Sequence, residues 1–206
     1  MIDHFDALAP LYDRLIGPPN PARLRDLLDL PATGWVLDAG GGTGRIAAQL
    51  RALTGNLVLL DRSQPMLRQA QGKGLWPIQG DVARLPFPDA CFDRAVVVDA
   101  LHHFPDQSAA IGELLRVLKP GGRLVIEEPD IARFTVKLVA LAERLALMGS
   151  YFATPPEMCA MLVAHGAQAR VVSDGGFAAW VVAEKATDAA AIERHTPPRE
   201  SVYTSG

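Results

Sequence analysis

Cysteine is scarce in this chain. Of its 206 residues only Cys91 and Cys159 are cysteines, and they lie far apart in the sequence. Two isolated cysteines offer neither a disulfide framework nor the closely spaced ligands of a zinc site. We therefore expect no disulfide to hold the fold together and no metal site.

An excess of basic residues is also missing. The formal net charge is −3, and acidic and basic residues are mixed along the chain. Proteins that bind a phosphate backbone usually carry a basic stripe, which this composition does not provide. Nucleic acid is therefore a poor candidate for a partner, and we expect a small-molecule substrate instead.

Long hydrophobic runs are absent as well. The most lipophilic helix-like stretch, residues 134–148, contains Lys137, Glu143 and Arg144 and is too short to span a bilayer. The first residues lack the basic region and apolar core of a secretory signal. With 49% hydrophobic and 21% charged residues, the composition is that of an ordinary globular protein. We expect a cytoplasmic protein without integral membrane contact; its oligomeric state stays open.

The middle of the chain alternates between strand-like and helix-like segments. Apolar runs predict strands over residues 35–38, 57–61, 76–79, 92–98 and 123–127. A helix is expected over residues 22–30 before the first strand, and further helices over residues 45–53, 63–71 and 106–118 between the strands. Gly55 is expected to end the second of these helices. Such alternation predicts an α/β fold with a parallel sheet covered by helices on both faces.

The later part of the chain departs from this alternation. Thr154 and Glu157 form a capping box that opens a helix to about residue 165. Two further strands, residues 169–173 and 178–184, follow with only a few residues between them. Such a short connection requires an antiparallel pair, because a parallel pair needs a crossover of about a dozen residues or more.

Four acidic residues fall at the carboxyl ends of successive predicted strands. They are Asp38, Asp61, Asp81 and Asp99. Parallel α/β sheets bind their ligands beyond this edge. Scattered surface acids would seldom show such placement, so the pattern indicates a ligand site.

The first of these acids opens a glycine-rich turn. In residues 36–47 a strand pattern leads through Asp38 to Gly40, Gly42 and Gly44 and then to a helix pattern. Glycine permits positive φ angles and has no Cβ, so the backbone of such a turn can approach a nucleotide-like ligand closely. The turn therefore predicts a nucleotide-like ligand.

The spacing of the glycines narrows the choice of ligand. A dinucleotide fingerprint, Gly-x-Gly-x-x-Gly, would need glycine where the chain has Arg45, and the Gly-Lys-Ser/Thr of a P-loop is absent. Asp38 would also repel a pyrophosphate. A ligand with a positive charge and no phosphate fits the turn better.

The chain resembles the class I S-adenosylmethionine-dependent methyltransferases, in particular the small-molecule branch that includes the ubiquinone and menaquinone C-methyltransferases. The matching motifs are residues 36–44, 60–63, 80–87, 92–93, 101–104 and 115–122. They stand in the family's order and cover about residues 36–128. The resemblance implies a Rossmann-like, seven-stranded, mostly parallel sheet with an antiparallel last strand and helices on both faces.

The resemblance also implies a place for each part of the cofactor S-adenosylmethionine. Asp38 and Gly40 would lie beside its methionine part, where Gly42 and Gly44 let the backbone approach. Asp99 would border the sulfonium and the substrate.

The adenosine part would contact residues after the second and third strands. Asp61 would accept hydrogen bonds from both ribose hydroxyls, since a carboxylate has two acceptor oxygens. Arg62 or Met66 would pack near the adenine. Asp81 would accept from the exocyclic amine, and the Val82 amide would donate to the ring.

The expected domain boundaries follow from the same resemblance and from the polar, proline-containing last residues. We expect a single methyltransferase domain over residues 1–186 and a tail over residues 187–206. Residues 1–34 would form an N-terminal helical lid in which Tyr12 reaches the cofactor, although a plain core tyrosine is an equal alternative. Residues 129–157 would form a helical insertion on the substrate side.

His102 and His103 are the candidates for a general base. They follow Asp99 at the ligand edge of the sheet, and a base assists the transfer when the acceptor must lose a proton. A structural role for both is the alternative. The predicted function is methyl transfer to a small, hydrophobic molecule at O, N or C; a silent cofactor-binding module and, less favoured, a nicotinamide oxidoreductase remain alternatives.

Overall fold

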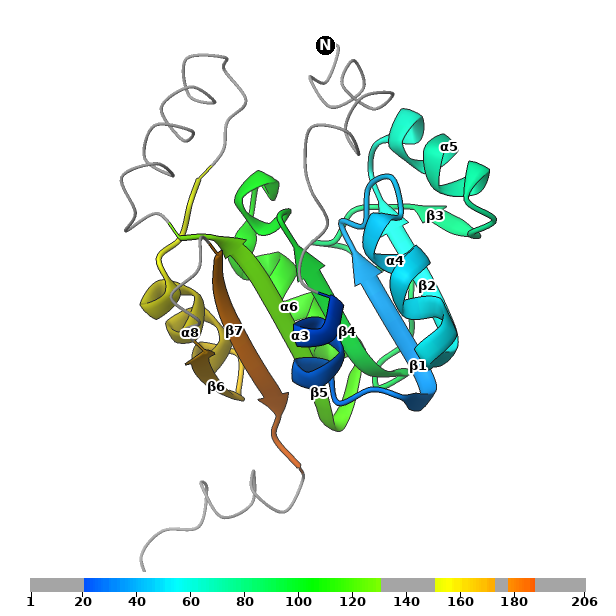
Figure 1. Cartoon of the computed structure of the whole chain (residues 1–206). Coiled ribbons are helices and arrows are strands. Elements are labelled where there is room, and N and C mark those ends of the chain that lie inside the picture. The colour runs from blue at the N-terminus through cyan, green and yellow to red at the C-terminus, as the bar shows by residue number, and fades with distance from the viewer. Residues whose placement is uncertain (1–20, 131–150, 173–177, 188–206) are drawn as a thin grey trace, which may run out of the picture.

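The computed structural model describes residues 21–130, 151–172 and 178–187 (Figure 1). Its centre is a seven-stranded sheet with the strand order β3-β2-β1-β4-β5-β7-β6. The strands are β1 (Ala32–Ala39), β2 (Thr54–Asp61), β3 (Pro77–Gln79), β4 (Phe92–Val98), β5 (Leu118–Pro129), β6 (Ala167–Val172) and β7 (Ala178–Lys185). β7 runs antiparallel to both of its neighbours, and the strands from β3 to β5 pair in parallel. The predicted fold class is confirmed.

Helices cover both faces of this sheet, as predicted (Figure 1). They are α3 (Pro21–Leu28), α4 (Arg45–Leu50), α5 (Gln64–Gly72), α6 (Gln107–Val117) and α8 (Pro155–Ala164), with short 3₁₀ turns η1 (Arg51–Leu53) and η2 (Leu101–His103). α3, α4 and α5 pack on one face, while α6 and α8 pack on the other.

The two cores follow from the alternation of side chains along the strands. In β4, Val96 and Val98 pack against the face of α3 and α4, whereas Ala95 and Val97 belong to the core under α6 and α8. Successive strand residues point to opposite faces, so a strand buried on both sides reads as a continuous apolar run. This explains why the sequence of residues 92–98 predicted the strand well.

Helix starts are placed at the edge where the parallel strands end. α4 follows β1, α5 follows β2 and α6 follows β4. Asp106 caps α6 by accepting a hydrogen bond from the Ala109 amide at 2.9 Å, and the predicted capping box of Thr154 and Glu157 is present at α8. This edge therefore collects helix N-termini together with the strand-end acids.

The prediction for Gly55 is wrong. The helix after the glycines shortens to α4, continues as η1, and β2 has already begun at Thr54. A Cβ on Gly55 would lie 2.4 Å from the Thr33 carbonyl oxygen. The glycine is needed because the β1 segment approaches β2 closely there, not because a helix ends there.

Several predicted segments lie outside the described residues. These are residues 1–20 of the expected lid, residues 131–150 of the expected insertion and residues 188–206 of the expected tail. The domain boundaries stay predictions for this reason. No helix in the described part of the chain is long and apolar enough to cross a bilayer.

Candidate functional site

The glycine turn joins β1 to α4 at the carboxyl edge of the sheet. The amides of Gly40 and Gly41 both donate to the Leu60 carbonyl, at 2.8 and 3.2 Å. Gly40, Gly42 and Gly44 have φ angles of 71°, 53° and 75°, in the left-handed region that side chains with a Cβ disfavour. The turn conformation itself therefore requires the three predicted glycines.

The surroundings of these glycines differ. A Cβ on Gly40 would lie 2.9 Å from the Ala100 Cβ, and one on Gly44 would lie 2.4 Å from a methyl of Leu75. At Gly42 the nearest atom within 4 Å would be the Asp61 Oδ2, at 3.9 Å. Gly40 and Gly44 thus allow close packing within the protein, and Gly42 borders open space.

Gly41 belongs to the same turn but was not among the predicted site residues. A Cβ there would lie 2.8 Å from the Asp38 carboxyl and from Leu59. The unbroken run Gly40-Gly41-Gly42 was the available signal. Gly41 lets the turn fold down onto Asp38.

Asp38 is buried beneath the turn, with 1% of its surface exposed. Its Oδ2 accepts a hydrogen bond from the Ala47 amide in the first turn of α4, at 3.1 Å. Burial raises the pKa of Asp38 to about 7, the hydrogen bond from Ala47 opposes this shift, and the nearby Asp61 adds to it. Asp38 therefore links the end of β1 to the start of α4.

Asp61 ends β2 on the open side of Gly42. Its Oδ2 accepts from the Gly42 amide and its Oδ1 from the Ser63 amide, both at 2.8 Å. Burial raises the pKa of this carboxyl, and the hydrogen bonds from Ser63 and Gly42 oppose the rise. Each carboxylate oxygen has a further lone pair, so the oriented fork can accept two hydroxyl groups.

The residues predicted near the adenine have different surroundings. Met66 is buried in the first turn of α5, and Arg62 is exposed. The exposed Asp81 accepts a hydrogen bond from the Ala83 amide at 2.9 Å, and the side chain of Val82 is buried in the core. The Gly80 amide donates to the Asp61 carbonyl at 3.0 Å, which connects this turn to the end of β2.

Asp99 turns the chain after β4. It has a φ angle of 53° although it is not glycine, and aspartate tolerates this region better than most residues. Its amide donates to the Glu127 carbonyl at 2.8 Å. The turn leads directly into η2, which carries both candidate histidines.

His102 forms a buried pair with Glu128, the last acid before Pro129 in β5. His102 and Glu128 are each 3% exposed, and Nδ1 lies 2.5 Å from Oε2. The other oxygen, Oε1, accepts from the amides of Ala100 and Leu101 at 2.9 and 2.7 Å. The sequence reasoning missed Glu128, although it too stands at a strand end on the ligand edge.

The rings around His102 are closely packed. His103 lies 3.8 Å away between ring centroids, and Phe152 stacks on His102 at 4.3 Å. Burial, with a smaller effect of His102, lowers the pKa of His103 to about 3. His103 is therefore a neutral imidazole at physiological pH.

Hydrogen bonds and close packing connect several of the predicted site residues. Asp38 reaches Asp61 through the glycine turn, and Gly40 packs on Ala100 beside the His102 and Glu128 pair. Tyr12 lies outside the described residues. In the described part of the chain no group of His, Cys, Asp and Glu is arranged to hold a metal ion.

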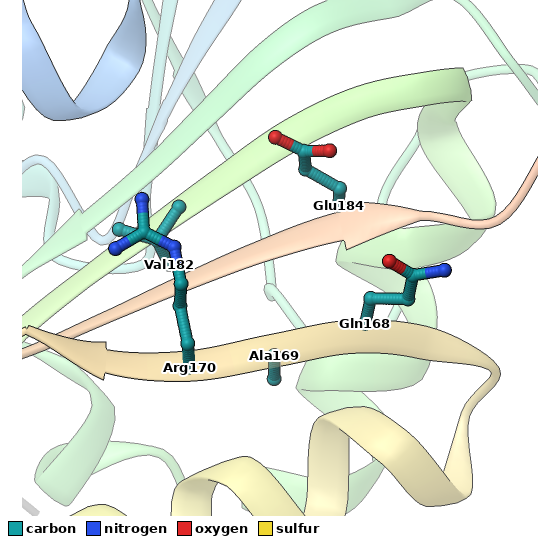
Figure 2. A pocket seen from close by; sticks show the side chains of 5 residues that line it. All are labelled: Gln168, Ala169, Arg170, Val182 and Glu184. Atoms are coloured by element: carbon teal, nitrogen blue, oxygen red, sulfur yellow. The ribbon is translucent and has the colours of Figure 1, made fainter.

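A surface hollow of about 240 Å³ lies elsewhere, on β6 and β7 (Figure 2). Its lining residues are Gln168, Ala169, Arg170, Val182 and Glu184. Glu184 pairs with Arg123, and Arg123 pairs with Arg94 near the start of β4, so the hollow extends toward the sheet edge opposite the strand-end acids. The hollow is therefore separate from the candidate cofactor site.

Comparison with known proteins agrees with this arrangement. Residues 37–126 match the family model described as "Methyltransferase domain". A demethylmenaquinone methyltransferase of Thermus thermophilus is 39% identical over an alignment of 139 residues, and the match covers 60% of this chain and 63% of the relative. A ubiquinone/menaquinone biosynthesis C-methyltransferase of Pseudomonas putida is 39% identical over 118 residues, 52% of this chain and 45% of the relative. The matches thus span about half to three fifths of these relatives' length.

A solved structure shows the same fold. It is a methyltransferase of Thermotoga maritima, described as a possible histamine N-methyltransferase, and it superposes with a TM-score of 0.72 over 88% of this chain and 97% of that one. The two sequences are 20% identical, so this likeness supports the fold alone. Residues 37–126 of this chain are thus similar in sequence to a methyltransferase domain, and the fold is that of a solved methyltransferase.

Proposed function

We propose that the protein transfers a methyl group from S-adenosylmethionine to a small, hydrophobic molecule. The observation that carries the proposal is the contact between Gly42 and Asp61: a left-handed glycine with open space beside it, facing a carboxylate held by two backbone amides. This combination suits a ribose diol next to a close backbone.

Different described residues would contact different parts of the cofactor. Asp61 would hold the ribose and Met66 would border the adenine, with Arg62 at the exposed rim. Asp81 and the Val82 amide would meet the adenine edge, and Asp38, Gly40, Gly44 and Asp99 would shape the methionine side. When bound, the cofactor supplies a methyl group on a positively charged sulfur.

The protein's own part in the reaction is alignment and proton removal. The residues around the turn would hold the acceptor in line with the methyl group and its sulfur, and a base would take any proton that the acceptor loses. Alignment of this kind can contribute about 7–11 kcal/mol. His102 is the better base of the two histidines, because a pKa of about 3 makes His103 a weak base at neutral pH.

Electron-rich aromatic rings are the acceptor class that we favour. The two curated relatives are named for the methylation of menaquinone and ubiquinone precursors. Because the chain matches only part of their length, the acceptor has to be tested with several classes. A set of hydroquinones, phenols and amines with isotope-labelled cofactor would identify the atom that is methylated, O, N or C.

Calorimetry tests the cofactor directly. We expect binding of S-adenosylmethionine and of its demethylated product, and no binding of NAD. The Asp61→Asn variant should bind the cofactor about 10- to 100-fold more weakly, because a hydrogen bond to a charged group contributes about 1.5–3 kcal/mol. Asp26→Asn, at an exposed carboxylate bonded to its neighbour Arg25, is the matched control.

The results separate the alternatives. Binding of NAD alone would refute the assignment and favour an oxidoreductase. Cofactor binding without methylation of any acceptor class would favour a silent cofactor-binding module.

A further inference from the structure

We propose that Glu128 is a positioning residue that holds His102 in the tautomer protonated at Nδ1, so that the ring's lone pair is at Nε2. This inference rests on the proposed methyl transfer, for which His102 is the base. The inference is based on the contacts of one buried carboxylate, that of Glu128.

Both oxygens of Glu128 are engaged by donors. Oε1 accepts from the amides of Ala100 and Leu101 at 2.9 and 2.7 Å, and Oε2 faces the His102 Nδ1 at 2.5 Å. Because amides can only donate, Oε1 must act as an acceptor, so only Oε2 is left to share a proton with the ring. In the proposed state that proton is on Nδ1, and the carboxylate accepts its hydrogen bond.

The rest of the ring's surroundings fix its orientation. Phe152 stacks on it at 4.3 Å with an angle of 17° between the rings. The His102 carbonyl accepts from the Tyr151 amide at 2.9 Å, and the Tyr151 carbonyl accepts from the Gln107 side chain at 2.6 Å. Residues 151–152 therefore clamp His102 against the end of β5.

The pair also adjoins the glycine turn. Glu128 binds the amide of Ala100, and a Cβ on Gly40 would lie 2.9 Å from the Ala100 Cβ. The same carboxylate thus sets the position of the base and of the backbone that supports the turn. A carboxylate that fixes a histidine tautomer for proton transfer is a known arrangement in other enzymes; here it would also stabilise the positive charge that His102 gains with the acceptor's proton.

The Glu128→Gln variant tests this arrangement, because it changes the tautomer without changing the shape. The Gln carbonyl oxygen must still face the two amides, so its NH₂ group must face Nδ1. Nδ1 then has to accept, and the proton moves to Nε2. Glu184→Gln, at a carboxylate that pairs with Arg123 near the opposite edge, is the matched control.

Nitrogen NMR of the histidine rings reads the tautomer independently of activity. We expect protonation of the neutral His102 ring at Nδ1 in the wild type and in Glu184→Gln, and at Nε2 in Glu128→Gln. With 1,4-naphthohydroquinone as acceptor, kcat of Glu128→Gln should fall about 10²- to 10⁴-fold, the contribution of a general base. Calorimetric affinity for S-adenosylmethionine should match that of the control.

The outcomes are distinct. A wild-type His102 protonated at Nε2, or an unchanged tautomer in Glu128→Gln, would overturn the proposal, and the first result can be obtained even if the variant does not fold. A switched tautomer in Glu128→Gln with a kcat equal to that of the control would refute a role of Glu128 in proton transfer. Absence of cofactor binding and of methylation in the wild type would instead refute the proposed function, while the NMR signals still decide whether Glu128 sets the tautomer.

Discussion

Asp38 shows how a single residue can combine a structural and an electrostatic role. Its carboxyl is buried, accepts the Ala47 amide and lies close to a second acid, Asp61. A site that receives a positively charged sulfonium gains from negative charge, but burial makes that charge unfavourable before a ligand arrives. Stability and binding therefore place opposite demands on this carboxyl.

The pH dependence of stability should reveal this conflict. Since burial raises the pKa of Asp38 to about 7, the folded protein retains a proton that the unfolded chain loses near pH 4. The free energy of unfolding should then fall as pH rises from about 4 to 7, by at most about 1.4 kcal/mol per pH unit for this group. In Asp38→Asn, whose amide oxygen still accepts from Ala47, this component should disappear. Chemical denaturation of both proteins without cofactor across this range measures it, and equal slopes would contradict it.

The sequence predicted the site residues unequally. Asp61 could be predicted because a short apolar run places it at a strand end. In the structure the Gly42 and Ser63 amides orient its carboxylate, as the predicted contact with two ribose hydroxyls requires. Glu128 was missed because its role depends on a fold-back of η2 onto β5, a contact between residues far apart in sequence. Local patterns show where a side chain stands along a strand, and only tertiary structure shows its partners.

At the level of elements, the glycine turn combines two tasks that the sequence pattern does not distinguish. Gly42 borders open space, whereas Gly44 begins α4 against Leu75 and Ala70 next to α5. Both have positive φ angles. The motif thus unites a ligand contact with the packing of one helix on another.

Alanine at each position should separate the two tasks. Both variants bear backbone strain of about 1–2 kcal/mol. Gly44→Ala should lose further stability, about 1–3 kcal/mol, because its methyl would lie 2.4 Å from Leu75. Gly42→Ala should lose mainly affinity for S-adenosylmethionine. Thermal unfolding and calorimetry on both variants give the comparison, and a larger drop in melting temperature for Gly42→Ala would count against this division.

Element boundaries were harder to predict than the elements themselves. The strand predicted over residues 123–127 is longer in the structure, where β5 begins at Leu118 and shifts register before Arg123. Gly55 was read as a helix end because glycine is common there, and the structure uses it for close strand contact. Glycine is compatible with both, so its presence alone could not decide.

For the whole molecule, the sheet separates a ligand edge from an opposite edge. The acids, the glycine turn and the starts of α4, α5 and α6 gather at the first edge. The hollow on β6 and β7 extends toward the other (Figure 2). A ligand bound at the first edge should therefore stabilise that edge more than the opposite one.

Hydrogen exchange with and without S-adenosylmethionine should map this division. We expect slower exchange at the amides of Gly40–Gly42, of Ser63 and of residues 99–102, because a bound ligand opposes local opening. Amides of residues 167–170 should change little and serve as an internal control. Protection centred on β6 and β7 would place the ligand in the hollow and contradict the site.

The place of β7 in the sheet sets an order of events during synthesis. β7 follows β6 in the chain but lies between β5 and β6, and among the described strands β6 pairs with β7 alone. Until residues 178–185 leave the ribosome, the long hydrophobic edge of β5 has no strand beside it and β6 has nothing to pair with. Such an edge is a template for wrong pairing, so the emerging chain is most vulnerable to aggregation after the ligand edge can already assemble and just before the last strand closes the sheet.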